Sequence, residues 1–503
     1  MWSHCAFIAG VFLLLLSDRR VASEDPETWW SIGQEELRET LRTVRNVNKA
    51  KNVVVFVGDG MGVTTVTAAR ILQGQLKGAS GEEGYLYFEK FPHTGLLKAY
   101  SNNMQVSESS ASGTALFSGQ KVNSDTVGLS SKATPKQCRG SQEFSIDGLL
   151  QWAQANGKST GAVTTTRVTH STPAGLYAHC ANEDWEADTD IPSSEQDGHC
   201  KDVATQLVET SPGNRLDVLM GGGWTKFLPN VPNAVDGPTM KSGCRADGRN
   251  LIEEWLAEKR RRGGNHSFVD SRESLLQVDP KTDSLLGLFS AGAMNPKLGR
   301  AESSTEPELK EMAVKAVEIL AKNPNGYFLM VEGGLIDDSH HRGLAARALH
   351  ETIAFAETVQ AVDAITNSND TLLIVVADHS HALIFTGYQK RGTSILGFGS
   401  RKLTDQKPFT SLLYLSGKGS SGDVPRRNIS ADNTTAPDYQ QQAFLPTPWA
   451  MHLGEDVPIF AKGPWSHLFV GVHEQHYVAH AINYAACLRN DTLTSCDSND
   501  ITA

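Results

Sequence analysis

The sequence predicts an α/β fold in which a mostly parallel central sheet carries helices on both faces. Apolar, strand-like runs alternate with stretches of helical spacing along most of the 503 residues, which is the pattern of strands joined by crossover helices. Three of the runs also end directly in carboxylates or imidazoles. Since the carboxyl ends of parallel strands share one edge of a sheet, where ligands bind, these side chains should converge there.

The expected strands are short, and most of them are apolar. Those that lead into reactive side chains are Val53 to Val57 before Asp59, Tyr327 to Val331 before Glu332, and Leu372 to Ala377 before Asp378 and His379. Two further strands are expected over Thr160 to Thr166 and Leu216 to Met220. Continuous apolar runs of this length are typical of parallel strands that are buried on both faces.

The expected helices fall between these strands. Helical spacing of apolar residues marks Val63 to Gln75 and Leu344 to Ile365. The best marked helix spans Pro307 to Lys322, with Thr305 as its cap and Pro307 in its first turn, where a proline is well tolerated. From about 387 to 451 the helical periodicity disappears, which indicates a smaller region inserted into the main domain of residues 51–503.

The N-terminal residues predict a secreted, extracellular protein. A short apolar stretch, Ala6 to Leu16, precedes small residues, and we interpret residues 1–23 as a cleaved signal peptide. A buried N-terminal helix or a signal anchor is the alternative. Residues 24–50 follow as an N-terminal arm, with helical spacing from Trp29 to Val47. No later run is long enough to cross a bilayer, and the polar C-terminus lacks the tail of a glycolipid anchor signal.

The composition describes an ordinary globular protein and excludes one class of partner. Apolar residues make up 39% of the chain and the net charge is −11. Non-specific binding of nucleic acid requires a basic surface, so nucleic acid is not an expected partner. An anionic substrate would have to be attracted locally by bound cations.

Cysteines and sequons support an extracellular location. Besides Cys5 in the signal, six cysteines remain, which are Cys138, Cys180, Cys200, Cys244, Cys487 and Cys496. An even number in a secreted chain favours disulfides, and Cys487 with Cys496 can close a small loop. Free buried thiols are the alternative. Sequons for N-glycosylation occur at Asn265, Asn369, Asn428, Asn433 and Asn490.

Three side chains could form a zinc site with an open position for substrate. Asp337 and His341 lie four residues apart, so that one helical turn brings both to one ion. His452, far away in the chain, could be the third ligand. The remaining histidines, His381 among them, are interpreted as structural residues or as neighbours of the ligands.

A second zinc and a magnesium ion could lie beside the first. Asp378 and His379 are adjacent at a strand end and could hold the second zinc together with Asp59. Glu332 and Thr172 offer the oxygen ligands that magnesium prefers, with Asp59 shared between the two ions. Two zinc ions a few ångströms apart stabilise the entering and the leaving oxygen of an in-line displacement.

A run of small residues, Gln105 to Ala115, leads into an expected helix. Small residues at the start of a helix let backbone N–H groups approach an oxyanion. A serine in such a run, beside zinc, could act as a nucleophile without a histidine base. A plain polar loop is the alternative.

Together these segments resemble the alkaline phosphatase family, over nearly the whole chain after the signal. The matching motifs are Val57 to Gly62, Thr164 to Arg167, His170 to Ala174, Val331 to Gly334, Ile336-Asp337, His340-His341, Ala377 to His381 and Gly454 to Val457. The resemblance implies hydrolysis of small phosphate monoesters through a phosphoserine at Ser109, with two zinc ions and one magnesium ion. It gives the same three ligand sets as above and places His170 next to the magnesium ligands.

The resemblance has further implications for assembly and covalent links. It implies a homodimer in which the N-terminal arm embraces the partner, and a crown formed by the insertion at about 387–451. It pairs Cys138 with Cys200 and Cys487 with Cys496. Cys180 and Cys244 are extra and form a third candidate pair. The family's calcium site has a glutamate where this chain has Ser290, so no calcium site is claimed.

Two departures from the family concern the phosphate-binding groups. The family's arginine that grips the substrate phosphate is replaced by Glu183, and the aspartate before the nucleophile is replaced by Glu108. Losing this bidentate clamp predicts a roughly 10- to 100-fold loss of activity. A carboxylate that points into the site would add repulsion, unless Glu183 turns into solvent. Weakened phosphomonoesterase activity is therefore the main prediction. A catalytically impaired binding protein that keeps its metals, or an extracellular matrix protein, is the alternative.

Overall fold

The computed structural model describes residues 26–196, 200–231, 242–401, 403–420, 422 and 426–489. The chain divides between Arg42 and Thr43 into two units. The described part of the first unit contains helix α1 (Pro26–Leu41), which buries none of its side chains. The signal predicted over residues 1–23 lies outside the described residues. Within those residues, no helix combines the length and the apolar character needed to cross a membrane.

The second unit contains a large, mostly parallel sheet. Its strands in chain order are β1 (Asn52–Gly58), β2 (His93–Lys98), β3 (Ser159–Arg167), β4 (Val218–Gly222), β5 (His266–Val269), β6 (Ser284–Leu288), β7 (Tyr327–Gly333), β8 (Thr371–Ala377), β14 (Val457–Lys462) and β15 (Gly471–Glu474). The spatial order is β15-β2-β14-β8-β1-β7-β3-β4-β6-β5, and β14 alone of these described strands runs antiparallel to its neighbours. The predicted fold class is confirmed.

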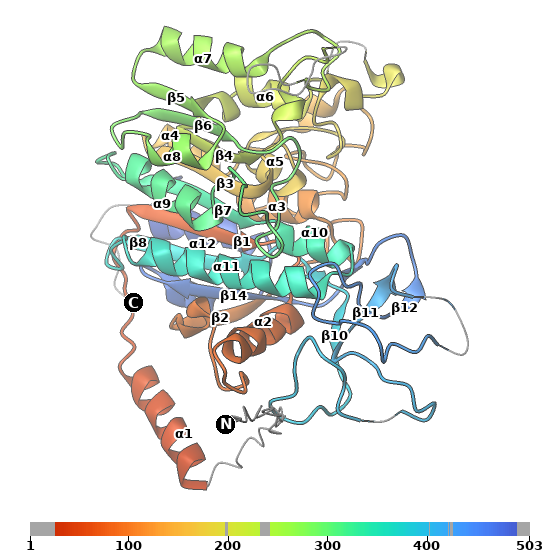
Figure 1. The fold of residues 1–503 in the computed structure, drawn as a ribbon. Helices are drawn as coiled ribbons and strands as arrows, with labels where there is room; N and C mark the ends of the chain where they lie inside the picture. Colours follow the sequence, from red (N-terminus) through yellow and green to blue (C-terminus); the bar gives the residue numbers. More distant parts are fainter. Residues whose placement is uncertain are drawn as a thin grey trace, which may run out of the picture. The chain divides into compact units, whose positions relative to one another are not determined.

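Helices cover the sheet in two groups (Figure 1). The first group contains α2 (Val63–Leu76), α9 (Leu309–Leu320) and α11 (Ala345–Asp363), in which α11 contacts both of the others. The second contains α3 (Ser109–Ser118), α4 (Leu149–Ala155), α5 (Ser171–Tyr177) and α12 (Tyr477–Ala486). The shorter α10 (Leu335–His341) follows β7, while α6 (Val203–Glu209), α7 (Leu251–Arg262) and α8 (Arg272–Leu276) accompany the strands from β4 to β6.

The start of α9 corrects one sequence prediction. The helix begins at Leu309 rather than at Pro307, and Glu308 rather than Thr305 occupies the cap position. The Glu308 N–H donates to the carboxylate of Glu311 at 3.0 Å. A side chain of the helix itself therefore binds the backbone N–H of the cap residue. The Thr305 carbonyl instead accepts from the N–H of Arg272, the first residue of α8.

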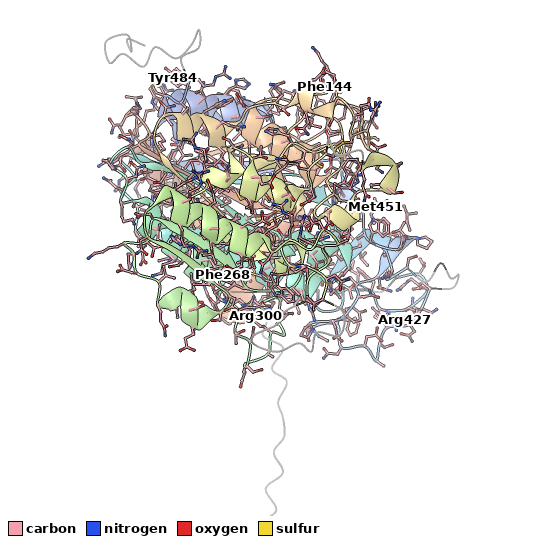
Figure 2. All side chains as sticks on the ribbon, turned by 90° about the horizontal axis from the view of Figure 1, so that it is seen from above. Phe144, Phe268, Arg300, Arg427, Met451 and Tyr484 are labelled. Atoms are coloured by element: carbon pink, nitrogen blue, oxygen red, sulfur yellow. A yellow bond between two sulfur atoms is a disulfide. The ribbon has the colours of Figure 1, made fainter. Side chains whose placement is uncertain are left out.

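The region predicted as an insertion contains no helix among its described residues between 387 and 451. It contributes β11 (Leu412–Gly417) and β12 (Ala443–Pro446) to a three-stranded sheet with β10 (Leu383–Phe385), which lies at one side of the main sheet (Figure 1). Arg427 lies toward the outside of this region and Met451 nearer the main body (Figure 2). A separate pair, β9 (Ser380–His381) and β13 (His452–Leu453), follows β8 and the insertion.

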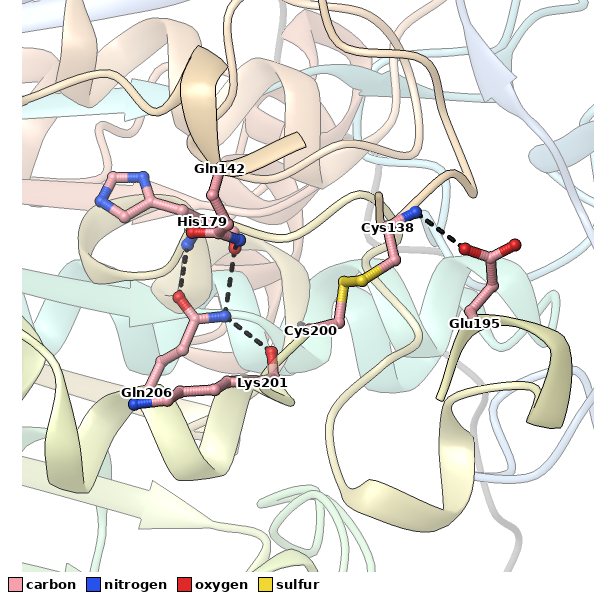
Figure 3. The surroundings of a disulfide bond; sticks show 7 residues. All are labelled: Cys138, Gln142, His179, Glu195, Cys200, Lys201 and Gln206. Carbon is pink, nitrogen blue, oxygen red and sulfur yellow. Dashed lines mark hydrogen bonds between the residues drawn. A yellow bond between two sulfur atoms is a disulfide. The ribbon is translucent and has the colours of Figure 1, made fainter. Parts of the chain in front are cut away.

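The cysteines are only partly paired as predicted. Cys138 and Cys200 form a disulfide (Figure 3), and the Cys138 N–H donates to Glu195 at 2.9 Å. The suggested pair of Cys180 with Cys244 is wrong, because both thiols are free. Cys180 is buried in the core, whereas the Cys244 backbone pairs with the loop at Thr225.

The remaining covalent predictions are partly outside the described residues. Cys496 lies there, so its pairing with Cys487 stays a prediction. Asn490 lies there as well. The other four sequon asparagines, Asn265, Asn369, Asn428 and Asn433, are all exposed, as an acceptor for a glycan must be.

Candidate metal centre and catalytic pocket

Strand register brings the predicted ligands to one edge of the sheet. Gly58 of β1 pairs with Gly333 of β7 on one side and with Ala377 of β8 on the other. Asp59 and Asp378 therefore leave neighbouring strands at the same level. The chain turns sharply after Asp59 because Gly60 takes a φ of 66°, a conformation that glycine adopts without strain. The Gly60 N–H then donates to Asp378 at 3.1 Å.

Asp337, His341 and His452 form the first cluster. Asp337 and His341 share one face of α10, as their spacing predicts, and His341 Nε2 lies 3.1 Å from Asp337 Oδ2. His452 comes from β13, and its Nε2 lies 3.4 Å from Asp337 Oδ1. These atoms are close enough to share one ion. The structure thus brings together three side chains that span more than a hundred residues of sequence.

The hydrogen bonds of the two imidazoles assign their tautomers. His341 Nδ1 donates to the Ala450 carbonyl at 2.7 Å, and His452 Nδ1 donates to the Ser107 carbonyl at 2.9 Å. Each neutral ring is left with a lone pair on Nε2, and these two atoms lie 3.1 Å apart. Two facing lone pairs repel each other unless a proton or a cation lies between them. Backbone carbonyls that orient imidazoles in this way are typical of metal sites.

His381 is a fourth member of this cluster that the sequence placed outside the ligands. Its Nδ1 accepts from the Ala382 N–H at 3.1 Å, so its proton is on Nε2, which points to Asp337 Oδ1 at 3.4 Å. A protonated nitrogen cannot bind a metal, although Nε2 has no hydrogen-bond partner among the described residues. Its spacing of two residues from His379, both at a strand end, is the signal that could have placed it here.

Asp59, Asp378 and His379 form the second cluster. His379 Nε2 lies 3.3 Å from Asp378 Oδ2 and 3.5 Å from Asp59 Oδ1. Asp378 Oδ1 is occupied by the N–H groups of Gly60 and His379. The three side chains are almost fully buried, and Asp59 Oδ2 has no hydrogen-bond partner among the described residues. A buried carboxylate oxygen without a donor is costly, and a bound cation would compensate it.

The third cluster lies around Glu332 and shares Asp59 with the second cluster. Glu332 Oε2 accepts from the hydroxyls of Thr164 and Thr166. Glu332 Oε1, Thr172 Oγ1 and His170 Nδ1 are buried without a hydrogen-bond partner among the described residues. Asp59, His170 and Glu332 are close enough to share one ion. The set is rich in oxygen, as a magnesium site requires.

The carboxylates of these clusters carry strongly shifted pKa values. Burial raises the pKa of Asp378 to about 6 and that of Glu332 to about 7. Burial, followed by the charges of Asp378 and Asp337, raises the pKa of Asp59 well above its ordinary value. Burial alone would also raise the pKa of Asp337, but the charge and hydrogen bond of His341 hold this pKa well below the ordinary value of an aspartate. The shared edge thus holds more negative charge than it can stabilise, and divalent cations would relieve this excess.

Ser109 is the first residue of α3 and lies beside the second cluster. Its Oγ lies 3.1 Å from His379 Nε2 and donates to Asp59 Oδ1 at 3.4 Å. The side chain is buried but borders a pocket of about 180 Å³. A hydroxyl in this position can attack an electrophile that enters the pocket.

Glu108 occupies the N-cap of α3 and modifies the predicted oxyanion site. Its carboxylate accepts from the Ser110 N–H at 2.5 Å and the Ala111 N–H at 3.0 Å. It also accepts from the Asp125 N–H at 3.1 Å. Two of the backbone N–H groups that were expected to bind an anion therefore donate to the capping carboxylate of Glu108 instead. The prediction that the helix start is open to an oxyanion is wrong for these two donors.

Glu183 lines the same pocket as Ser109 and does not turn into solvent. Its Oε2 accepts from the Ser171 hydroxyl at 2.5 Å, and its backbone N–H donates to the Asp125 carbonyl. Burial and the neighbouring charge of Glu108 raise the pKa of Glu183 well above its ordinary value. At acidic to neutral pH the side chain therefore holds its proton more firmly than an exposed glutamate does.

Arg167 also lines the pocket but is bound to another residue. Its Nε donates to both oxygens of Glu186, at 3.0 and 2.8 Å, and its Nη2 donates to Glu186 Oε1 at 2.6 Å. Thr169 donates to the same carboxylate. A guanidinium held in this bidentate pair is not free to grip a phosphate in place of the missing clamp.

Comparison with known proteins agrees with the sequence and the geometry. The family profile for alkaline phosphatase matches residues 50–488. The chain is 44% identical to the alkaline phosphatase of Gadus morhua, with 92% of this chain and 98% of that protein covered. It is also 44% identical to the tissue-nonspecific isozyme of Homo sapiens, with 92% and 89% covered.

Solved structures show the same fold at lower identity. Thermus thermophilus alkaline phosphatase superposes with a TM-score of 0.63 at 21% identity, covering 90% of this chain and 94% of that one. Alkaline phosphatase from the Antarctic bacterium TAB5 gives a TM-score of 0.59 at 20% identity, covering 88% and 100%. On the family match and the two relatives above, the chain belongs to the alkaline phosphatase family.

Proposed function

We propose that the chain hydrolyses small phosphate monoesters through a phosphoserine at Ser109. The observation that carries this proposal is the position of the Ser109 hydroxyl, 3.1 Å from His379 Nε2 and 3.4 Å from Asp59 Oδ1. The family membership supports the reaction class. Buried polar atoms that lack hydrogen-bond partners support metal binding next to the nucleophile.

Three ions would be held by the clusters described above. One zinc would take Asp337, His341 and His452, and the other would take Asp59, Asp378 and His379. Magnesium would take Asp59, Thr172 and Glu332, with His170 beside it. When bound, such ions supply positive charge that stabilises the attacking and leaving oxygens and favours the ionised forms of serine and water.

The side chains of the chain position the reacting groups. Asp59 Oδ1 accepts a hydrogen bond from Ser109 Oγ and so helps to hold this hydroxyl at the border of the pocket. The phosphorus–oxygen bond to the alcohol breaks as the bond to Ser109 Oγ forms, and the alcohol leaves with a proton. Water then attacks the phosphoserine, which releases inorganic phosphate and restores the serine hydroxyl. Holding both reactants in the pocket removes most of the entropic cost of their encounter.

We propose that this activity is weakened by Glu183 and Glu108. Glu183 replaces an arginine of the family, and no free guanidinium in the pocket takes its place, since Arg167 is paired with Glu186. An ionised Glu183 would also repel the substrate phosphate. The lost charged hydrogen bonds correspond to roughly 10- to 100-fold in kcat/KM.

A metal-retaining binding protein is the second candidate, and the two glutamates are the observation that favours it. Glu108 and Glu183 both line the pocket, where they suit a cationic ligand better than a phosphate. The catalytic geometry of Ser109 gives the hydrolase the stronger support. Turnover of a simple monoester distinguishes the two candidates.

We further propose a secreted, glycosylated homodimer. Four described sequons are exposed, which glycosylation requires. Leu96, Val470 and Val472 on and beside the sheet edge at β15 are 37 to 59% exposed, and α1 buries none of its side chains. An apolar edge of this kind and an uncovered helix suit a second copy of the chain.

Metal removal tests the proposed function directly. The purified protein, supplied with zinc and magnesium, is expected to release p-nitrophenol from p-nitrophenyl phosphate. Treatment with a chelator should reduce the rate by about a thousandfold or more, because the buried carboxylates then repel the substrate, and adding both metals back should restore it. Zinc binding without turnover would support the binding protein, and a rate that is unaffected by the chelator would contradict the metal-dependent mechanism.

A further inference from the structure

A second and much larger cavity adjoins the catalytic pocket. It has a volume of about 1040 Å³ and lies between the start of α11 and the crown region of residues 387–451. His341 lines both this cavity and the catalytic pocket. A molecule whose reacting phosphate lies at Ser109 could therefore extend past His341 into the larger space.

The cavity is basic, although the chain as a whole carries a net charge of −11. The charged residues in its lining are Arg342, Arg347, Lys418 and Arg427, with Asp432 and Asp438 as the acidic members. A concentration of positive charge in a hollow of an acidic protein focuses the local potential and attracts anions.

Two of these basic groups remain available to a ligand. Lys418 is exposed and has no ion-pair partner within the described part of the chain. Arg347 uses its Nε to donate to the Pro437 carbonyl at 3.0 Å, and its charge also acts on the buried carboxylate of Glu351. The other two are paired, Arg342 with Asp338 at 3.1 Å and Arg427 with Asp432 at 2.5 Å.

The wall of the cavity also offers apolar and aromatic surface. Trp449, which is 56% exposed, lines it together with Pro448 and Tyr439. Such residues pack against the carbon skeleton of a ligand, while the basic groups bind its charged end. The lining thus suits an organic spacer that ends in an anion.

We propose that the preferred substrates are phosphate monoesters whose leaving group carries a second phosphate, which binds at Lys418 and Arg347. This inference rests on the proposed function and specifies its substrate class. The catalytic pocket has lost its own cationic clamp to Glu183, so binding free energy from a remote group would compensate for weak contacts at the reacting phosphate. Arginine and lysine are the side chains that bind phosphate most often in this way.

A matched pair of substrates tests the proposal. The quantity is the ratio of kcat/KM for a linear alkanediol bisphosphate to kcat/KM for the alkyl monophosphate of the same length, so that any general change in activity cancels. We expect a ratio of about tenfold or more, which Lys418→Glu and Arg347→Ala each reduce by about five- to tenfold. Lys390→Glu changes the same charge on an exposed residue outside the cavity and should leave the ratio unchanged.

Binding can be measured without any turnover. An alkane bisphosphonate, which cannot be hydrolysed, is titrated against the metal-loaded protein while tryptophan fluorescence is recorded, after removal of glycans because Asn433 lines the same cavity. The signal is expected to depend on Trp449 and to vanish in Trp449→Phe, and Lys418→Glu should weaken binding by about five- to tenfold.

The outcomes distinguish failure of the proposed hydrolase from failure of the proposed phosphate subsite. Failure of both the monophosphate and the bisphosphate to react would contradict the proposed hydrolase, while bisphosphonate binding that depends on Lys418 would still support the subsite. Turnover of the monophosphate with a ratio near one, or binding that Lys418→Glu does not weaken, would overturn the subsite.

Discussion

Ser109→Ala is expected to reduce kcat/KM for p-nitrophenyl phosphate by about a thousandfold or more. The variant removes the hydroxyl that lies 3.1 Å from His379 Nε2 and donates to Asp59, and with it the covalent route through a phosphoserine. Folding should be little affected, because the hydroxyl makes no other hydrogen bond among the described residues. Steady-state kinetics measure the loss, and rapid acid quenching should no longer trap labelled phosphate on the protein.

Ser110→Ala is the matched control for this variant. Ser110 is buried next to the nucleophile, and its Oγ has no hydrogen-bond partner among the described residues. We expect less than about a threefold change in kcat/KM. If Ser110→Ala abolishes turnover while Ser109→Ala retains it, the assignment of the nucleophile is wrong.

Glu183→Arg is expected to raise kcat/KM by roughly 10- to 100-fold and to tighten inhibition by inorganic phosphate by a similar factor. The arginine would supply the bidentate clamp that the pocket lacks. It would also remove a carboxylate that lies beside Glu108 and accepts a hydrogen bond from the Ser171 hydroxyl. Initial-rate kinetics with p-nitrophenyl phosphate, with phosphate as competitor, measure both effects.

Glu183→Gln and the pH dependence distinguish two causes of weak activity: repulsion between an ionised Glu183 and the substrate phosphate, and the absence of the phosphate-binding arginine. The pKa of Glu183 is raised by burial and by Glu108, so the neutral form persists above the pH at which a free glutamate ionises. As the pH rises through this raised pKa, the side chain becomes negative and affinity for phosphate should fall. Glu183→Gln should lose this decline without the full gain of Glu183→Arg. If neither variant gains activity, Glu183 is not the cause of weak activity and the pocket binds phosphate through other groups.

The positions of the proposed metal ligands could be predicted from the sequence because strand ends obey a simple rule. Continuous apolar runs predict buried parallel strands, whose carboxyl ends must lie together, and this placed Asp59, Glu332 and Asp378 at one edge. The four-residue spacing of Asp337 and His341 predicted their common helix face. His452 needed the family resemblance, because no local pattern connects it to residues a hundred positions away.

Other features depend on contacts that local sequence does not encode. The start of α9 was set by the hydrogen bond of Glu308 with Glu311 rather than by Pro307. The role of Glu108 as the cap of α3 and the burial of Glu183 follow from loops that meet at Asp125. Arg347 comes from α11, whereas Lys418 follows strand β11 in the crown region. Only the folded chain shows that both residues line one cavity.

The metal content of the purified protein shows whether the three clusters of side chains bind ions. Elemental analysis of protein prepared without chelators and dialysed against metal-free buffer should give two zinc ions and one magnesium ion per chain. Asp337→Ala should lower the zinc content by at least one ion, since it removes a carboxylate of the first cluster that is also close enough to Asp59 and His379 to share an ion with them. A wild-type protein that holds no zinc, or that keeps the same zinc content after loss of Asp337, would contradict this account.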